Sequence, residues 1–267
     1  MKKFTNSITL LLTILLSAVS VYAQDGDGRV YVSNNPQGEG IIVKWVGPKI
    51  IYPEGVNIYR KQGSAEWVKI TKSPIMPPKA LENKSRFSEN EINLFDAYLN
   101  LPLDSFATGF EGVFTVMESM NNLDFSFAFN LAYLDLDVKK GDTYQYKVES
   151  SIKGKKVVFG TTEMIEAQAY KKLPSPVDLS VERKKRQTEI IWQNDEAHHF
   201  YYNLYIKRGN DEWEALAKEV FSGSISEDKK KYYLAIPTSA DTAYSYKIEA
   251  LSYFGELSEQ SEVLVSP

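Results

Sequence analysis

The sequence has no cysteine and only two histidines, the adjacent pair His198-His199, among its 267 residues. Without cysteine there is no disulfide framework, no thiolate metal site and no cysteine nucleophile. With so little imidazole, most metal-binding and catalytic-triad chemistry is excluded as well. The formal net charge of -4 argues against a nucleic-acid-binding protein, whose contact face should be basic. These absences remove many functional classes before any motif is considered.

The composition that remains is that of a folded protein. Hydrophobic residues make up 43% of the chain, which is enough to build real cores, and the length allows one large or two ordinary domains. Proteins outside the cytoplasm usually rely on disulfides when their domains are small. Domains without cysteine must therefore be stabilised by their hydrophobic cores.

The first 23 residues have the pattern of a secretory signal peptide. Lys2 and Lys3 precede a short apolar run, Ile8 to Leu16, and a small-residue stretch that ends at Ala23. A membrane-spanning helix needs about 18 or more apolar residues, and this run is shorter. The pattern predicts cleavage near Ala23 and an extracytoplasmic protein, periplasmic or secreted, without a membrane span.

An internal repeat is the strongest signal in the chain. The segment NIYRKQGSAEW, residues 57–67, recurs as NLYIKRGNDEW, residues 203–213, with six residues identical at the same spacing. Upstream, IIVKW at residues 41–45 matches EIIW at residues 189–192, and downstream the segments beginning at Asp142 and Tyr244 match as well. All four tryptophans occupy paired positions. The chain therefore contains two copies of one unit.

The unit has the period of two that is typical of half-buried strands. Ile41, Val43 and Trp45 alternate with Ile42 and Lys44, and the downstream segments of both copies alternate in the same way. This pattern predicts one face on a core and the other in water. Several such strands, separated by turn residues in a unit of roughly 100 residues, favour a sandwich of two antiparallel sheets.

These residues resemble the fibronectin type III domain. The second copy has the leading prolines Pro174 and Pro176, a strand-B tryptophan (Trp192), a strand-C tyrosine (Tyr205) and Tyr244 at the place of the family's tyrosine corner. The first copy has the corresponding residues Trp45, Tyr59 and Tyr144 but no leading proline. The resemblance covers residues 29–72 and 136–267. It implies an all-β fold of two tandem immunoglobulin-like sandwiches and says little about function, because this sandwich serves many functions.

The first copy carries an insertion. Trp67 and Tyr144 are 77 positions apart, whereas Trp213 and Tyr244 are 31 apart, so the first copy has 46 extra residues, within 73–137. Eight of the 13 phenylalanines lie in this range. Ser88 and Glu91 form a capping box ahead of a helical stripe, and Thr108 and Glu111 form a second. Residues 123–133 alternate but lack β-branched residues, so we predict a helix there too.

Other candidate sites have a simpler explanation. Asp195, Glu196 and the two histidines form the best metal-like cluster, but their spacing fits no known ligand pattern. Asp25 and Asp27 lack the rest of a calcium-binding loop. Asp135 and Asp137 are expected to be turn and cap residues. Two basic runs, residues 183–186 and 229–231, are interpreted as solvated turns. No catalytic motif occurs in the sequence. We therefore predict a non-enzymatic protein without cofactor or metal.

The predicted organisation is a signal peptide, residues 1–23; a fibronectin type III-like domain with a mainly helical insertion, residues 24–172; and a second such domain, residues 173–267. The aromatic residues of the insertion either pack as a small core on the sandwich or form a partner-binding surface. The partner-binding candidates are Tyr98, Phe106, Phe110, Phe114, Met117 and Met120. The expected partner is a protein or polysaccharide of the envelope or extracellular space. The alternatives are an accessory module of a carbohydrate-active enzyme and a structural subunit of an envelope or fibre assembly.

Overall fold

A computed structural model describes residues 28–47, 49, 51–102, 110–184, 187–193, 199–220, 224–225, 231–237 and 243–265. The chain divides into two compact units, with the division between Lys171 and Lys172. Each unit is described by itself below. Within these ranges no helix has both the length and the apolar character that crossing a bilayer requires.

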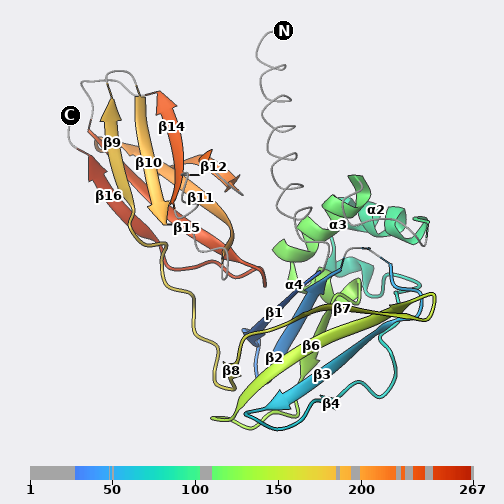
Figure 1. Cartoon of the computed structure of the whole chain (residues 1–267). Helices are drawn as coiled ribbons and strands as arrows, with labels where there is room; N and C mark the ends of the chain where they lie inside the picture. The colour runs from blue at the N-terminus through green and yellow to red at the C-terminus, as the bar shows by residue number, and fades with distance from the viewer. Residues whose placement is uncertain are drawn as a thin grey trace. The chain divides into compact units, whose positions relative to one another are not determined.

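The first unit is a sandwich of two antiparallel sheets (Figure 1). One sheet has the order β1-β2-β5 and the other the order β4-β3-β6-β7, with β8 paired to β6. The strands are β1 (Arg29–Asn34), β2 (Ile41–Val46), β3 (Val56–Gln62), β4 (Val68–Lys69), β5 (Ala132–Asp135), β6 (Thr143–Ile152), β7 (Lys155–Thr161) and β8 (Ile165–Glu166).

The second unit repeats this arrangement. Its sheets have the orders β13-β14-β10-β9 and β12-β11-β15-β16. The strands are β9 (Ser180–Lys184), β10 (Gln187–Gln193), β11 (His199–Arg208), β12 (Glu214–Val220), β13 (Ser224–Ile225), β14 (Lys231–Pro237), β15 (Tyr244–Ser252) and β16 (Ser261–Val265).

The strand orders confirm the predicted fold class. In both units the first, second and fifth major strands form one sheet, and the third, fourth, sixth and seventh form the other, which is the fibronectin type III arrangement. Trp45 and Trp192 are fully buried in the two cores. The hydroxyl of Tyr144 accepts a hydrogen bond of 2.9 Å from the backbone N–H of Lys139, as the tyrosine corner requires. The chain thus contains two tandem fibronectin type III-like sandwiches.

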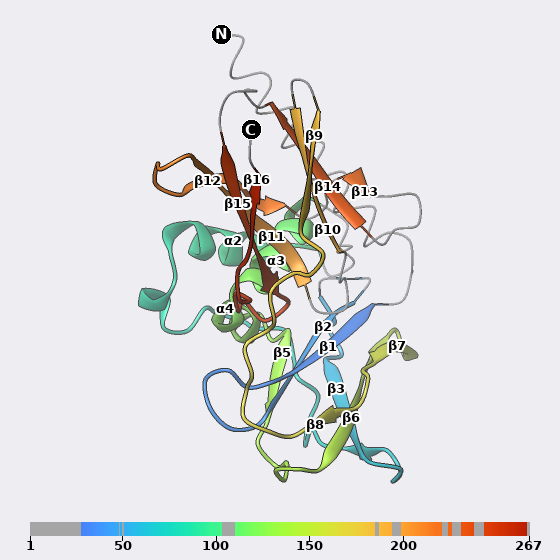
Figure 2. The same ribbon diagram turned by 90° about the vertical axis from the view of Figure 1, so that its left-hand side faces the viewer.

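The first unit carries its helices between β4 and β5. They are the 3-10 helix η1 (Lys84–Arg86), α2 (Glu89–Leu99), α3 (Phe110–Asn121) and α4 (Leu123–Ala128), and the α-helices lie together at one end of the sandwich (Figures 1 and 2). The predicted capping box is confirmed, because the Ser88 hydroxyl accepts from the Glu91 N–H and the Glu91 carboxylate accepts from the Ser88 N–H. The second predicted box begins at Thr108, which lies outside the described residues.

Two details of the predicted insertion are wrong. The helix expected over residues 123–133 ends at Ala128, and Asn130 then adopts a left-handed conformation with φ of 54°. Ala132 and Tyr133 belong to β5, where Ala132 lies opposite Lys44 of β2. The connection between β4 and β5 is residues 70–131, here called the insertion, and the expected range 73–137 wrongly included a strand of the sandwich.

The expected alternation is also wrong for β2. Ile42 and Lys44, predicted to face water, are both 0% exposed, as are Ile41, Val43 and Trp45. The Lys44 ammonium donates a hydrogen bond to the backbone carbonyl of Ser119 in α3. The strand is buried on both faces because a helix of the insertion approaches its outward side.

Lys44→Met is expected to raise the free energy of unfolding of the first domain by about 1 to 4 kcal/mol near neutral pH, because an apolar side chain avoids the cost of burying an ammonium group or of removing its proton. The Ser119 carbonyl keeps a partner, since the Ser126 hydroxyl also donates to it. Burial lowers the pKa of Lys44 well below its ordinary value. The unfolded chain therefore binds a proton that the folded chain releases, and this term makes the wild type more stable as pH rises toward about 10.4.

Urea denaturation of both proteins between about pH 7 and about pH 9.5 measures the effect. The stability difference between Lys44→Met and the wild type should shrink as pH rises. Lys139→Met, at an exposed lysine, is the control and should leave stability unchanged at every pH. A difference that stays constant over this range would show that folding does not lower the pKa of Lys44.

Candidate functional site

The predicted partner-binding residues do not form one exposed surface. Tyr98 and Met120 are buried, at 2% and 0% exposure, so these two side chains are packing residues and the prediction is wrong for them. Phe114 and Met117 of α3 are half-buried. Phe106 and the side chain of Phe110 lie outside the described residues.

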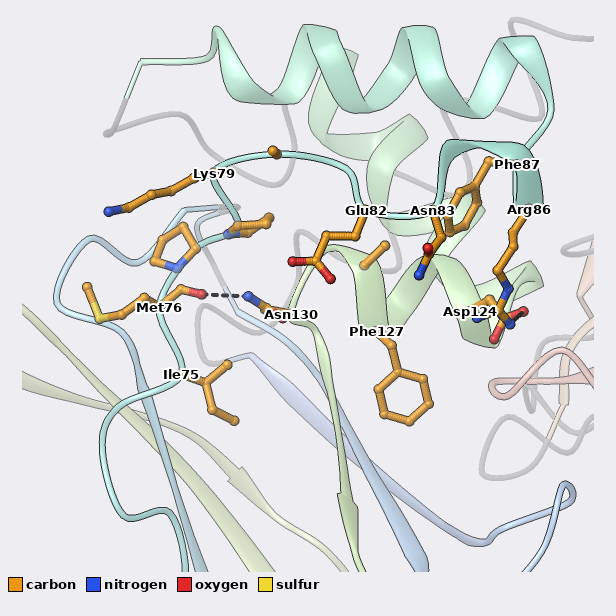
Figure 3. A pocket seen from close by; sticks show the side chains of 14 residues that line it. Ile75, Met76, Lys79, Glu82, Asn83, Arg86, Phe87, Asp124, Phe127 and Asn130 are labelled. Atoms are coloured by element: carbon orange, nitrogen blue, oxygen red, sulfur yellow. Dashed lines mark hydrogen bonds and ion pairs between the residues drawn. The ribbon is translucent and has the colours of Figure 1, made fainter.

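A groove lies elsewhere in the insertion, between the segment 75–87 and α4 (Figure 3). Its volume is about 840 Å³. The apolar part of its lining is Ile75, Met76, Pro77, Pro78, Ala80, Phe87, Phe127 and Ala128, and the polar part is Lys79, Glu82, Asn83, Arg86, Asp124 and Asn130. None of the six predicted binding residues lines it.

Two interactions connect the walls of the groove. At one end the Asn130 side-chain amide donates a hydrogen bond of 2.8 Å to the Met76 carbonyl, drawn as a dashed line in Figure 3. At the other end the Arg86 guanidinium pairs with the Asp124 carboxylate at 2.5 Å. Each interaction joins the segment 75–87 to α4 or the residues just after it. The groove is therefore formed before any ligand arrives.

The insertion positions the α4 wall through a third set of contacts. Asn122, the N-cap of α4, accepts from the Phe125 N–H and donates to the Glu91 carboxylate at 2.6 Å. Burial acts to raise the pKa of Glu91, but hydrogen bonds from Ser88 and Asn122 outweigh it and lower the pKa below its ordinary value. Glu91 thus stays ionised while it caps α2 and anchors the start of α4.

The side chains of the groove suit binding better than catalysis. Met76 is 47% exposed, and its thioether side chain can adapt to different shapes. Pro77 and Pro78, which follow Met76 in the same wall, stiffen its backbone. Charged residues are part of the same lining, and Lys79, Glu82 and Arg86 are all exposed. Apolar side chains mixed with exposed polar ones are typical of protein-recognition surfaces.

The metal-like candidates gain no support. Asp25, Asp27, Asp195, Glu196 and His198 lie outside the described residues. His199 is 7% exposed in β11, where its ring packs edge-on against Tyr202. Across the described ranges there is no group of three or more potential ligands placed to hold a metal ion.

Asp135 and Asp137 have a larger role than the turn and cap positions predicted for them. The Arg60 guanidinium pairs with Asp135 at 2.9 Å and with Asp137 at 3.1 Å, and the Tyr146 hydroxyl donates to Asp135 at 2.9 Å. Arg60 and Tyr146 belong to one sheet and Asp135 to the other. This cluster, here called the arginine clasp, joins the two sheets where the insertion returns to the sandwich.

The sequence carried a weak signal for the groove. Pro77-Pro78 and the polar stretch 79–87 contain no recognisable motif. Only their contact with α4 makes them the wall of a groove. Aromatic content instead drew attention to residues that the fold buries. Burial explains the difference, because aromatic side chains at helical spacing are the ones that a small helical layer packs inward.

No family model and no curated protein matches this chain. Several solved structures, however, are similar to it. A two-domain fibronectin type III segment from chicken tenascin is 11% identical, with 91% of this chain and 100% of that chain covered and a TM-score of 0.30. The chicken interferon gamma receptor alpha chain is 9% identical, with 91% and 98% covered and a TM-score of 0.30.

A third similar structure is that of the FN1-FN3 domains of chicken CNTN1. It is 11% identical, with 91% of this chain and 67% of that chain covered and a TM-score of 0.37. At these identities and scores no residue role is transferred from any of the three proteins. The fold assignment rests on the strand orders given above.

Proposed function

We propose that this protein is a non-enzymatic, extracytoplasmic binding protein whose first domain recognises a polypeptide segment of an envelope or extracellular partner in the groove of the insertion. The single observation that carries the proposal is the preformed groove between residues 75–87 and α4. The signal-peptide pattern of the first 23 residues supports a location outside the cytoplasm.

The groove favours a polypeptide. Its lining offers Met76, Pro77 and Phe127 as apolar contacts, and its charged residues Lys79, Glu82 and Arg86 are exposed. Apolar side chains of an extended peptide can contact such a lining while its polar groups pair with the exposed charged residues. Because the walls are held by the Arg86–Asp124 pair and the Asn130–Met76 hydrogen bond, little ordering entropy is lost on binding.

The test uses two methionines with the same exposure. Met76 lies in the groove and Met164 lies outside it, and each is 47% exposed. A photo-crosslinking amino acid placed at position 76 should give an adduct with one polypeptide, identified by mass spectrometry, while the same amino acid at position 164 should not. The purified partner is then titrated against Met76→Asp and Met164→Asp.

The expected result is a loss of partner affinity of at least about tenfold for Met76→Asp, because a carboxylate must be desolvated in an apolar contact. Met164→Asp should stay within about twofold of the wild type. Equal losses for the two variants, or an adduct at position 164 and none at position 76, would place recognition away from the groove.

A further inference from the structure

The outward face of the second sheet of the first domain is the other distinctive surface. Tyr59 of β3 lies directly between Lys69 of β4 and Lys147 of β6 in the strand register. Side chains two positions apart on a strand share a face, so Lys61 lies on the same side as Tyr59. Lys156 of β7 joins them, because its ammonium pairs with Glu149 of β6 at 2.8 Å. This basic face consists of Tyr59, Lys61, Trp67, Lys69, Lys147 and Lys156.

Aromatic rings and ammonium groups alternate on the basic face. The Lys147 ammonium lies 4.9 Å from the Tyr59 ring centre and 5.1 Å from that of Trp67, and the Lys61 ammonium lies 5.2 Å from Trp67. Both rings are half-buried, and Lys69 is exposed. The cation–π contacts hold Trp67 in place while part of its ring remains accessible to solvent.

The charge of the basic face is unbalanced. Its four lysines are opposed by Glu149, which is 5% exposed and pairs with Lys147 and Lys156 at 2.8 Å each. Burial acts to raise the pKa of Glu149, but its bonds to the two lysines prevail and lower the pKa. With four cations and one anion the face carries a net charge of +3, although the whole chain is acidic.

The second domain provides an internal comparison. It keeps the framework, with the Lys247 ammonium 4.2 Å from the Trp213 ring and the Tyr205 hydroxyl donating to Glu249 at 2.7 Å. Ala215, however, lies opposite Tyr205 at the place where the first domain has Lys69. Glu262 lies opposite Lys247, where the first domain has Thr161 opposite Lys147.

The shared and the differing residues therefore have different explanations. The Trp-Tyr-Lys-Glu framework occurs in both domains and serves the fold. On the second domain the corresponding lysines, Lys207 and Lys247, are balanced by Glu249 and Glu262. Among the described residues, this excess of positive charge occurs on the first domain and has no counterpart on the second, so the fold does not need it.

We propose that the basic face of the first domain binds an anionic polysaccharide, with the solvent-accessible part of Trp67 against a sugar ring and the lysines paired with uronate carboxylates. The four strands from β4 to β7 span about 14 Å at the usual strand spacing, so several linked sugars can lie across the face. Carboxylates repeating along a chain of apolar ring faces match ammonium groups that flank an aromatic ring. This site is separate from the groove of the insertion.

The experiment measures binding of alginate oligosaccharides, a polyuronate probe, by isothermal titration calorimetry on the full chain. Lys69→Glu with Lys156→Glu should lower the affinity at least about tenfold at low salt, because both charges on the outer strands are reversed. The matched control is Lys139→Glu with Lys140→Glu, which changes the net charge equally at exposed lysines off this face and should stay within about twofold.

A gain-of-function variant completes the test. Ala215→Lys with Glu262→Thr gives the second domain the residues that the first has at these two positions and should restore alginate binding to the Lys69→Glu, Lys156→Glu protein. Equal losses in the two charge-reversal doubles, polyglutamate bound as tightly as alginate, or no alginate binding by the wild type would each overturn the proposal. Met76→Asp should not affect alginate binding, so failure here and failure of the groove are distinguishable.

Discussion

Asp135→Asn should lower the free energy of unfolding of the first domain by about 3 to 5 kcal/mol, because it removes the buried partner of the Arg60 guanidinium and leaves only the exposed Asp137 carboxylate to balance that charge. The Asp135 side chain is 3% exposed, whereas that of Arg60 is 18% exposed. The asparagine amide keeps the shape of the carboxylate but is uncharged, and one of the two acceptor oxygens becomes an NH₂ donor. It therefore cannot replace both the hydrogen bond from the Arg60 guanidinium and that from the Tyr146 hydroxyl. Urea denaturation measures the loss of stability, and hydrogen exchange in the strands of the first domain assigns that loss to this domain.

Asp137→Asn is the matched control. Asp137 pairs with the same guanidinium at 3.1 Å, but its side chain is 96% exposed. Exposed ion pairs contribute about 0.2 to 1 kcal/mol, so this variant should be close to the wild type in stability. If the two asparagine variants lose equal stability, the clasp acts through simple charge attraction at the surface and burial of Asp135 is not the reason for its effect.

The fold was predictable because its framework residues occur twice. Trp45 and Trp192 occupy the same buried position in the two sandwiches. Two tryptophans with matching neighbours at the same spacing rarely occur by chance, so they indicated a repeated domain. The start of α2 was also predictable, since the Ser88 capping box depends only on residues within one turn. Local chemistry and exact repetition are both visible in a single sequence.

Features that depend on contacts between distant segments were not predictable. β5 has four residues and pairs with β2, about 90 positions earlier, so its alternation was too short to outweigh the helical character of the residues before it. Lys44 reads as a solvent-facing residue until Ser119 of α3 is known to lie above it. The arginine clasp likewise needs Arg60 and Asp135, from different sheets, to meet.

The candidate binding surface was least predictable for the same reason. The groove consists of a proline-containing segment and one face of α4, and neither has a recognisable motif. Tyr98 and Met120 looked like contact residues because they are large and apolar, but the insertion uses them for packing. Because the helical insertion is small, most of its apolar side chains are needed for its own core, and few remain on the surface to contact a partner.

Phe129→Ala should lower the free energy of unfolding of the first domain by about 3 to 5 kcal/mol, and the loss should extend beyond the insertion. Phe129 is 1% exposed, and its ring lies 4.8 Å from Phe95, 4.6 Å from Tyr98 and 4.4 Å from Phe125. These four aromatic residues belong to the same hydrophobic cluster as Trp45 of the sandwich. The insertion and the sandwich therefore share one core and should unfold together.

Hydrogen exchange tests whether the insertion and the sandwich unfold together, because the protection of backbone amides can be measured separately in α2 and in β3. Phe129→Ala in the insertion should reduce protection in β3, and Phe159→Ala in the sandwich, where Phe159 packs 4.5 Å from Tyr52, should reduce protection in α2. If each variant affects only its own part, the insertion folds as a separate subdomain. Reciprocal losses would mean that the groove is held by the whole core of the first domain, so that any partner bound there stabilises the sandwich as well.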